Sequence, residues 1–195
     1  MNVEVIHATP NPVDLVAVAA GVCYGKSDTN DARVERCMKA RHMGVFEHVG
    51  VTFRVSGISR ACSHQLVRHR MASYNQRSQR YCKEDTNYEF VVPNSVRDLG
   101  FGGAFEMCAA QCRDFYRRMV ASGVPAEDAR YILPQAGETE VYVTMNAREM
   151  FHFLDLRDDA HAQWEIRDVA RAMKAAAAAV DSQWAQLMGI YEAHR

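Results

Sequence analysis

The hydrophobic pattern changes its period within residues 49–68, whose sequence is VGVTFRVSGISRACSHQLVR. From Val49 to Val55 every second residue is apolar, which is the pattern of a strand with one buried face. From Ile58 to Arg68 the apolar residues recur at helical spacing instead. A strand that runs directly into a helix predicts a fold in which both kinds of element pack together.

The rest of the chain continues this mixture of short strands and longer helices. We predict further strands at residues 3–6, 88–92 and 141–145, and further helices at 12–23, 28–43, 104–121, 126–133, 147–156 and 160–193. The polar residues 69–81 are expected to form an ordered loop. No internal repeat, linker or break in composition divides the chain. We therefore predict a single α+β domain that spans residues 1–195.

Length and composition are those of an ordinary globular protein. The 195 residues are 48% hydrophobic and 24% charged, which excludes a disordered or collagen-like chain. The uncharged apolar run at residues 15–24 is too short to span a bilayer, and no basic segment precedes it. The six cysteines contain no CxxC pair, so we expect reduced thiols. These features predict a cytoplasmic protein with no membrane partner.

Positive charge is concentrated in one segment, residues 48–83, which contains no Asp or Glu and carries +7 while the rest of the chain carries −8. Arginines collected without carboxylates are typical of a site for an anion, here a nucleotide or dinucleotide. A solvated surface or a contact to nucleic-acid phosphates would have the same composition. The pI near 6.7 argues against nucleic acid as a partner, because nucleic-acid-binding domains are generally basic.

Other familiar motifs are absent or incomplete. The segment GVCYGKS, residues 21–27, resembles a phosphate-binding loop, but three residues rather than four separate its glycines. The sequence contains neither HExxH nor GxSxG, and no cluster has clear metal-ligand spacing, so we predict no metal.

A second group of polar residues follows in the C-terminal half. Arg148, Arg157 and His161 would share a face if their segment stays helical. Taken alone, His161 is more often a surface histidine than a ligand contact. Arg130 could likewise simply pair with Glu127.

The basic segment contains RHRMASYNQRSQRY at residues 68–81. An RHR triplet followed after seven residues by Ser is the signature of the flavin-dependent thymidylate synthases, and this sequence resembles that family at Arg68, His69, Arg70 and Ser78. Further blocks resemble the family in the same order along most of the chain: FEH at 46–48, Gln65, SGVP at 122–125, AR at 129–130, LP at 133–134, NAR at 146–148, LR at 156–157 and HAQWE at 161–165.

The resemblance implies the reductive methylation of dUMP to dTMP. It implies 5,10-methylenetetrahydrofolate as carbon donor, FAD as cofactor and NADPH as reductant. It also implies a small, mostly antiparallel sheet flanked by helices, in a homotetramer whose active sites are shared between subunits. The absence of a cysteine in a Pro-Cys-His context fits this family, because the other thymidylate synthases depend on such a nucleophile.

The resemblance also implies roles for individual residues. FAD would be held by Arg68, His69, Arg70, Gln76, Asn146, Arg148 and His152. The substrate dUMP would be held by Gln65, Arg68, Gln76, Ser78, Arg80, Arg130 and Arg157. Arg157 would be the catalytic residue, since its cation would stabilise the ionised pyrimidine and make C5 a better nucleophile. His48 and His161 are further candidates for contacts to flavin or folate.

Two of these positions depart from the usual family pattern. Gln76 stands where many members have Glu, which replaces a charge with an amide that can donate and accept. His152 stands where Asn is frequent. Two other hypotheses remain: a protein of the same fold that binds flavin or nucleotide without turnover, and an RNA-binding module that uses the basic segment. The retained Arg157 and Ser78 favour the enzyme.

Overall fold

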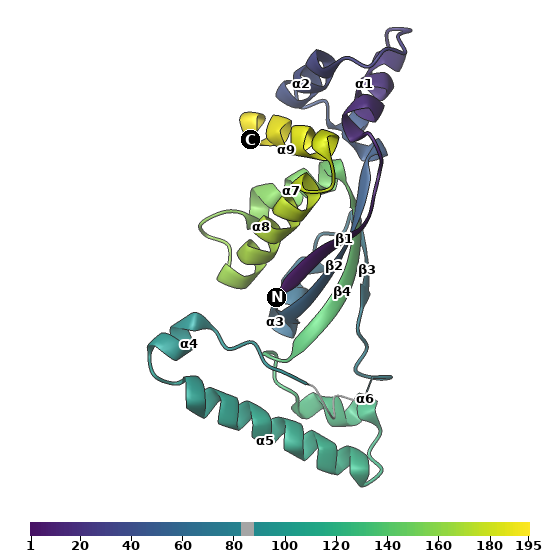
Figure 1. Cartoon of the computed structure of the whole chain (residues 1–195). Coiled ribbons are helices and arrows are strands. Elements are labelled where there is room, and N and C mark those ends of the chain that lie inside the picture. The colour runs from purple at the N-terminus through teal and green to yellow at the C-terminus, as the bar shows by residue number, and fades with distance from the viewer. Residues whose placement is uncertain (83–87) are drawn as a thin grey trace. The chain divides into compact units, whose positions relative to one another are not determined.

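A computed structural model describes residues 1–82 and 88–195; Lys83, the last cation of the basic segment, lies outside them. The described residues contain a four-stranded sheet in the order β1-β2-β4-β3 (Figure 1). Its strands are β1 (Asn2–Ala8), β2 (Gly50–Ser59), β3 (Ala72–Gln76) and β4 (Glu138–Asn146). Neighbouring strands are antiparallel, because hydrogen bonds join the end of one strand to the start of the next. Thr9 after β1 donates to Gly50 at the start of β2, Ala147 after β4 donates to Val49 before β2, and Arg77 after β3 donates to Glu140 near the start of β4. This confirms the predicted α+β class with a small antiparallel sheet.

The helices occupy the segments between and after these strands. They are α1 (Pro12–Val22), α2 (Asp31–Lys39), α3 (Arg60–Leu66), α4 (Asn94–Asp98), α5 (Gly102–Ala121), α6 (Ala126–Ala129), α7 (Ala147–Arg157), α8 (Trp164–Ala178) and α9 (Ser182–His194), with 3₁₀ helices η1 (Met43–His48) and η2 (Arg130–Ile132). No described helix combines the length and apolar character that a membrane crossing requires.

The contacts divide the chain into two compact units. Unit 1 comprises residues 1–55, 66–74 and 142–195, and unit 2 comprises residues 56–65 and 75–141. The single domain over residues 1–195 remains a prediction.

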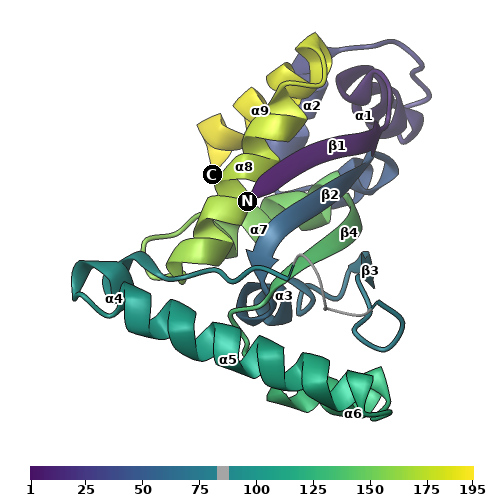
Figure 2. The same cartoon turned by 60° about the horizontal axis from the view of Figure 1, so that its bottom comes forward.

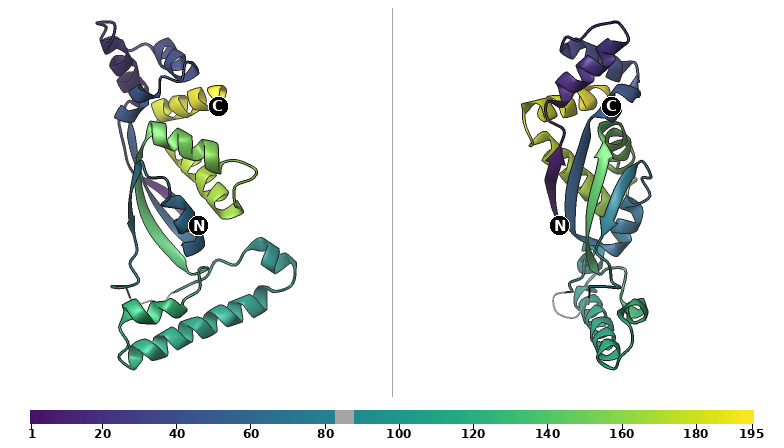
Figure 3. Two further views of the ribbon diagram at one scale, coloured as in Figure 1. Left: turned by 180° about the vertical axis from the view of Figure 1, so that it is seen from behind. Right: turned by 90° about the vertical axis from the view of Figure 1, so that its right-hand side faces the viewer.

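Unit 1 has its core where α7 and α8 lie along one face of the sheet (Figures 2 and 3). The period-2 pattern seen in the sequence explains this face, because Val51, Phe53 and Val143 point into the core and are at most 1% exposed. Phe151 of α7 stacks on Tyr191 of α9, with ring centroids 4.7 Å apart. Burying each aromatic side chain of this kind contributes about 2–3 kcal/mol to stability.

Unit 2 contains α5, whose inner side carries the fully buried Tyr116. The helix ends where the sequence predicts, because Gly123 adopts a φ of 94° and Val124 donates its amide to the Met119 carbonyl. Tyr88 lies directly against Gly137, where any side chain would overlap its ring. Gly137 is thus required by close packing.

Several predicted elements differ from the structure. The polar segment 69–81 is not all loop, since it contains β3. The segment 88–92 forms only an isolated bridge from Phe90 to Gly137. The segment 160–193 is two helices, because Asp181 interrupts it and caps α9 by accepting the amide of Trp184 at 2.8 Å. In place of the predicted helix 28–43 the structure has the shorter helix α2, which ends at Lys39. The strand β2 continues through Ser59, so α3 begins at Arg60 and not at Ile58.

Candidate active site

Helix α7 arranges the first group of site residues in unit 1. It begins directly after β4, and Asn146 caps it by accepting the backbone amide of Glu149 at 2.9 Å. Glu149, Phe153 and Arg157 are four residues apart in sequence, so they lie on one face of the helix over a rise of about 12 Å.

His69 lies against this face of α7. Its imidazole Nδ1 is 3.4 Å from Oε1 of Glu149, and its Nε2 accepts a hydrogen bond from Nε of Arg157 at 3.0 Å. Between these two contacts the ring meets Phe153 edge to face at 4.9 Å. The His69 carbonyl accepts from the Tyr74 hydroxyl at 2.8 Å. Contacts at both nitrogens and at the backbone fix this imidazole.

Burial determines the charge of this group. His69 is 5% exposed and Glu149 is 7% exposed. Burial, with the positive charge of Arg157 and the neighbouring His152, lowers the pKa of His69 to about 4. Burial raises the pKa of Glu149. His69 is therefore neutral at pH 7, and its Nδ1 lies 3.4 Å from a carboxylate oxygen of Glu149.

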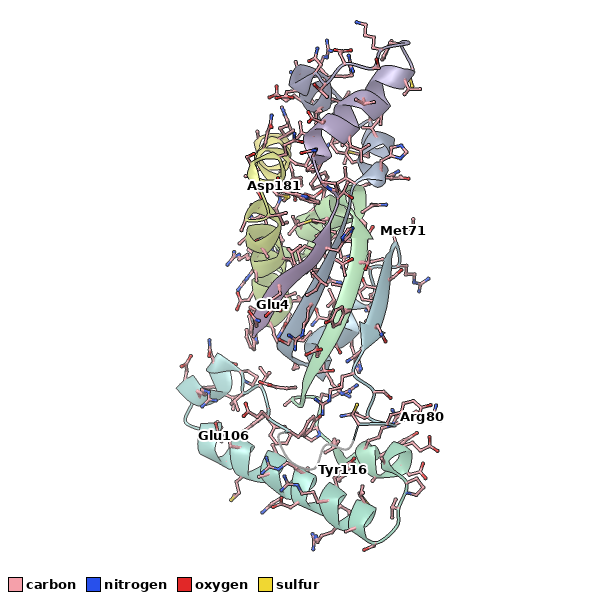
Figure 4. All side chains as sticks on the ribbon, turned by 45° about the vertical axis from the view of Figure 1, so that its right-hand side comes forward. Glu4, Met71, Arg80, Glu106, Tyr116 and Asp181 are labelled. Carbon is pink, nitrogen blue, oxygen red and sulfur yellow. The ribbon has the colours of Figure 1, made fainter. Side chains whose placement is uncertain are left out.

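A hollow of about 540 Å³ in unit 1 adjoins α7 and contains three of the predicted flavin contacts, Asn146, Arg148 and His152. Met71, labelled in Figure 4, also lines it. Arg148 donates to a carboxylate oxygen of Glu47, another lining residue. An anionic ligand in this hollow would compete with Glu47 for the Arg148 guanidinium.

The two arginines on either side of His69 have a different environment from the histidine. Arg68 and Arg70 are exposed. Arg70 lines a second hollow of about 410 Å³ in unit 1, which shares Met71 and Asn146 with the first. The predicted flavin contacts of unit 1 thus gather around α7 and the turn before β3.

His69, Glu149 and His152 also bring their ligand atoms within 4.8 Å of one another, which is close enough for a metal ion. The contact with Arg157 does not suit one, because a neutral imidazole that binds a metal through Nδ1 carries its proton on Nε2, whereas Nε2 of His69 accepts from Nε of Arg157. The Arg157 cation would in addition repel a metal ion. We therefore interpret these residues as a cluster of side-chain contacts around His69, and the absence of a metal remains a prediction.

The second group of predicted site residues lies in unit 2. The carboxylate of Glu127 binds Nε of Arg80 at 2.8 Å, and the Glu127 carbonyl accepts from Nε of Arg130 at 3.0 Å. The Ser78 hydroxyl accepts the backbone amide of Arg80 at 3.2 Å. Glu127 therefore accepts hydrogen bonds from two guanidinium groups. The expected pairing of Arg130 with Glu127 is found, but Arg130 contacts the backbone carbonyl of Glu127 and not its carboxylate.

Gln76 and Gln65 also belong to unit 2. The Gln76 amide donates to the hydroxyls of Ser63 at 2.9 Å and Thr139 at 3.1 Å. Both amide contacts hold the side chain between α3 and β4. Gln65 lies near the end of α3 and is partly exposed.

Two predicted residues are not brought to these groups. The prediction that Arg157 and His161 share one helical face is wrong, because α7 ends at Arg157. The His161 side chain is 98% exposed and contacts Asp159 at 2.9 Å. His48 is exposed at the end of η1 and does not line either hollow beside α7.

Sequence reasoning missed Glu149 and Phe153. The signal was available, because both residues precede the predicted catalytic Arg157 at intervals of four within a predicted helix. What the sequence could not supply was the partner, since His69 is 80 residues away from Glu149 along the chain.

The comparisons with known proteins define the class. Residues 4–181 match the family model described as thymidylate synthase complementing protein, so the chain belongs to this family. The chain is 45% identical over 186 residues to the flavin-dependent thymidylate synthase of Geobacter sulfurreducens, with 89% of this chain and 80% of that protein covered. It is 40% identical to the enzymes of the same name from Thermococcus onnurineus and Pyrococcus horikoshii, with 89% of this chain and 77% of each relative covered. The predicted resemblance to flavin-dependent thymidylate synthases is confirmed.

Proposed function

We propose that this protein is a flavin-dependent thymidylate synthase that converts dUMP to dTMP. The carbon would come from 5,10-methylenetetrahydrofolate, and NADPH would reduce the bound FAD. Family membership over residues 4–181 supports the activity. The observation that carries the proposal is the Arg157 guanidinium, fixed at Nε by a neutral buried histidine.

The residues around α7 suit a flavin nucleotide. The exposed guanidinium groups of Arg68, Arg70 and Arg148 match the phosphates of a dinucleotide, and the Asn146 and His152 side chains can hydrogen-bond to a polar ring edge. Glu47 would have to release Arg148 as the cofactor binds. When bound, the flavin supplies the hydride that completes the new methyl group.

Arg157 has the donors that pyrimidine activation needs. Its Nε is used by His69, and among the described residues no hydrogen bond is made by its two terminal nitrogens, which leaves both for a ligand. In a site that excludes water, a fixed cation stabilises negative charge on the pyrimidine by a few kcal/mol. Arg157 would thereby raise the electron density at C5, the carbon that is methylated.

The residues of unit 2 would hold the other end of dUMP. Ser78, Arg80 and Arg130 offer a hydroxyl and two guanidinium groups, which are typical phosphate donors. Gln65 and Gln76 would add amide contacts, and we retain His48 and His161 as candidates for flavin or folate. We also retain the homotetramer with shared active sites, so the two groups need not come from one chain, and the cytoplasmic location.

The absorption spectrum of the purified protein tests this proposal first. We expect a flavin spectrum that changes when dUMP is titrated, release of FAD on denaturation, and dTMP formation that requires both the folate and NADPH. A protein that binds no flavin from added FAD would refute the proposal. Binding of FAD and dUMP without any dTMP would instead identify the inactive homologue, and binding of RNA with a steep salt dependence would identify the nucleic-acid alternative.

A further inference from the structure

Glu149 is a buried carboxylate without a cationic partner. Among the described residues it forms no ion pair with Lys or Arg, and its side chain is only 8% exposed. Burying an ionisable group costs free energy unless another group compensates for it, and such groups are frequent at functional sites. Its Oε1 lies 3.4 Å from Nδ1 of His69, and the ligand atoms of Glu149, His69 and His152 all lie within 4.8 Å of one another. His69 is the member of this cluster that also contacts Arg157, so we consider the role of Glu149 through this histidine.

The hydrogen bonds of His69 require one tautomer. Arg157 cannot accept a hydrogen bond, so Nε2 of His69 must be the acceptor in their 3.0 Å contact. The proton of the neutral imidazole must then lie on Nδ1, which faces Oε1 of Glu149 at 3.4 Å. A carboxylate accepts hydrogen bonds, and it therefore favours the tautomer with a proton on Nδ1.

The other tautomer would disrupt the contact with Arg157. A proton on Nε2 would point at the Nε–H of Arg157, and two donors would oppose each other at 3.0 Å. Arg157 would have to turn away. The tautomer of His69, which faces Glu149 on one side and Arg157 on the other, thus determines whether the Arg157 guanidinium keeps its orientation.

We propose that Glu149 is a positioning residue, which fixes the tautomer of His69 so that His69 holds Arg157 in the orientation required for dUMP. This inference rests on the proposed function through the role of Arg157. The contact between His69 and Glu149 itself stands on the geometry.

The first test is the nitrogen NMR spectrum of the histidine side chains in the FAD-bound protein at about pH 7.5. The His69 signals are assigned by their loss in His69→Gln. We expect a protonated Nδ1 and an unprotonated Nε2 in the wild-type protein. A proton on Nε2, or a cationic ring, would overturn the inference without any variant of Glu149.

The second test replaces the carboxylate. Glu149→Met removes the acceptor at similar side-chain length, and Glu149→Gln keeps an oxygen that can accept from Nδ1–H. Because Glu149 also lines the hollow of about 540 Å³, turnover is measured at saturating FAD as well as saturating dUMP. In Glu149→Met we expect a changed His69 tautomer and a kcat lower by about tenfold or more under these conditions. Glu149→Gln should restore most of kcat and the original tautomer. Glu165→Met is the matched control, because Glu165 is equally buried but lies on α8.

The outcomes separate this inference from the proposed function. A His69 tautomer that Glu149→Met leaves unchanged would overturn the inference, and so would a changed tautomer with unchanged kcat. The same loss of kcat in Glu165→Met would assign the effect to general destabilisation and would also overturn it. If the wild-type protein made no dTMP, the proposed function would fail, while the tautomers of wild type and Glu149→Met would still decide whether Glu149 fixes His69.

Discussion

The buried His69 makes the stability of the protein depend on pH, and His69→Gln should remove that dependence. A glutamine at this position can accept from Arg157 and donate to Glu149, so it keeps both contacts without a titrating group. In the native protein the pKa of His69 is about 4, against an ordinary value of 6.5. The unfolded chain therefore binds a proton on His69 below about pH 6.5, whereas the native chain does not until about pH 4.

This difference sets the direction and the size of the effect. Between pH 6.5 and pH 4 the unfolded state binds more protons, so the free energy of unfolding falls as the pH falls. A pKa difference of one corresponds to about 1.4 kcal/mol. The wild-type protein should lose about 2–3 kcal/mol from this histidine between about pH 7.5 and about pH 4.5. The raised pKa of Glu149 acts in the opposite direction, but this carboxylate is present in both proteins.

Urea unfolding at about pH 7.5 and about pH 4.5, at one protein concentration, measures the effect. We expect wild type to lose about 2–3 kcal/mol more than His69→Gln. His64→Gln replaces an exposed histidine of α3 and should behave like wild type. Equal losses in wild type and His69→Gln would show that His69 is not held neutral by its surroundings, and the reasoning would be refuted.

Three further substitutions test other parts of the structure. Arg157→Ala should lower kcat for dTMP by about 100-fold with FAD affinity nearly unchanged, and equal turnover would remove Arg157 from the mechanism. Glu47→Gln should strengthen FAD binding, because Arg148 loses a competing carboxylate. The binding of riboflavin, which has no phosphate, should change less. Fluorescence titration measures both affinities, and equal changes for FAD and riboflavin would contradict the competition. Asp158→Asn should lower the free energy of unfolding by about 2 kcal/mol at pH 7 and make the loss of stability between pH 4 and pH 2 smaller by a similar amount, measured by urea unfolding. Burial raises the pKa of Asp158, but hydrogen bonds led by Lys174 bring it to about 2; an unchanged unfolding curve below pH 4 would contradict this account.

Elements with a strong local pattern could be predicted from the sequence. The alternation before Val55 gave β2, and Gly123 marked the end of α5. The strand β3 could not be predicted, because its residues Ala72–Gln76 are mostly polar and it pairs at the edge of the sheet. Its extended form depends on hydrogen bonds with β4, which no local pattern contains.

His69 and Arg157 of the candidate site could be selected from the sequence, but Glu149 and Phe153 were not selected, and the contacts among these residues could not be predicted. The resemblance selected His69 through the signature and Arg157 through the LR block at 156–157, and the structure places the two side chains in direct contact. The sequence assigned His69 to the flavin by resemblance, whereas the structure surrounds its ring with Glu149, Phe153 and Arg157. Contacts across such sequence distances arise from the packing of the turn before β3 on α7.

The charges of the basic segment explain why its RHR triplet contains two kinds of residue. Some arginines of the segment are compensated by distant carboxylates, as Arg80 is by Glu127 at 2.8 Å. Arg68 and Arg70 are exposed and form no ion pair with residues 1–82 and 88–195, so their charges remain for an anion. His69 between them is buried and neutral, because burial disfavours its charged form and the cation of Arg157 adds to this effect. The triplet therefore places cations at its ends and a neutral hydrogen-bond acceptor at its centre, and a lysine in place of His69 would destroy the contact with Arg157 although it would raise the positive charge of the segment.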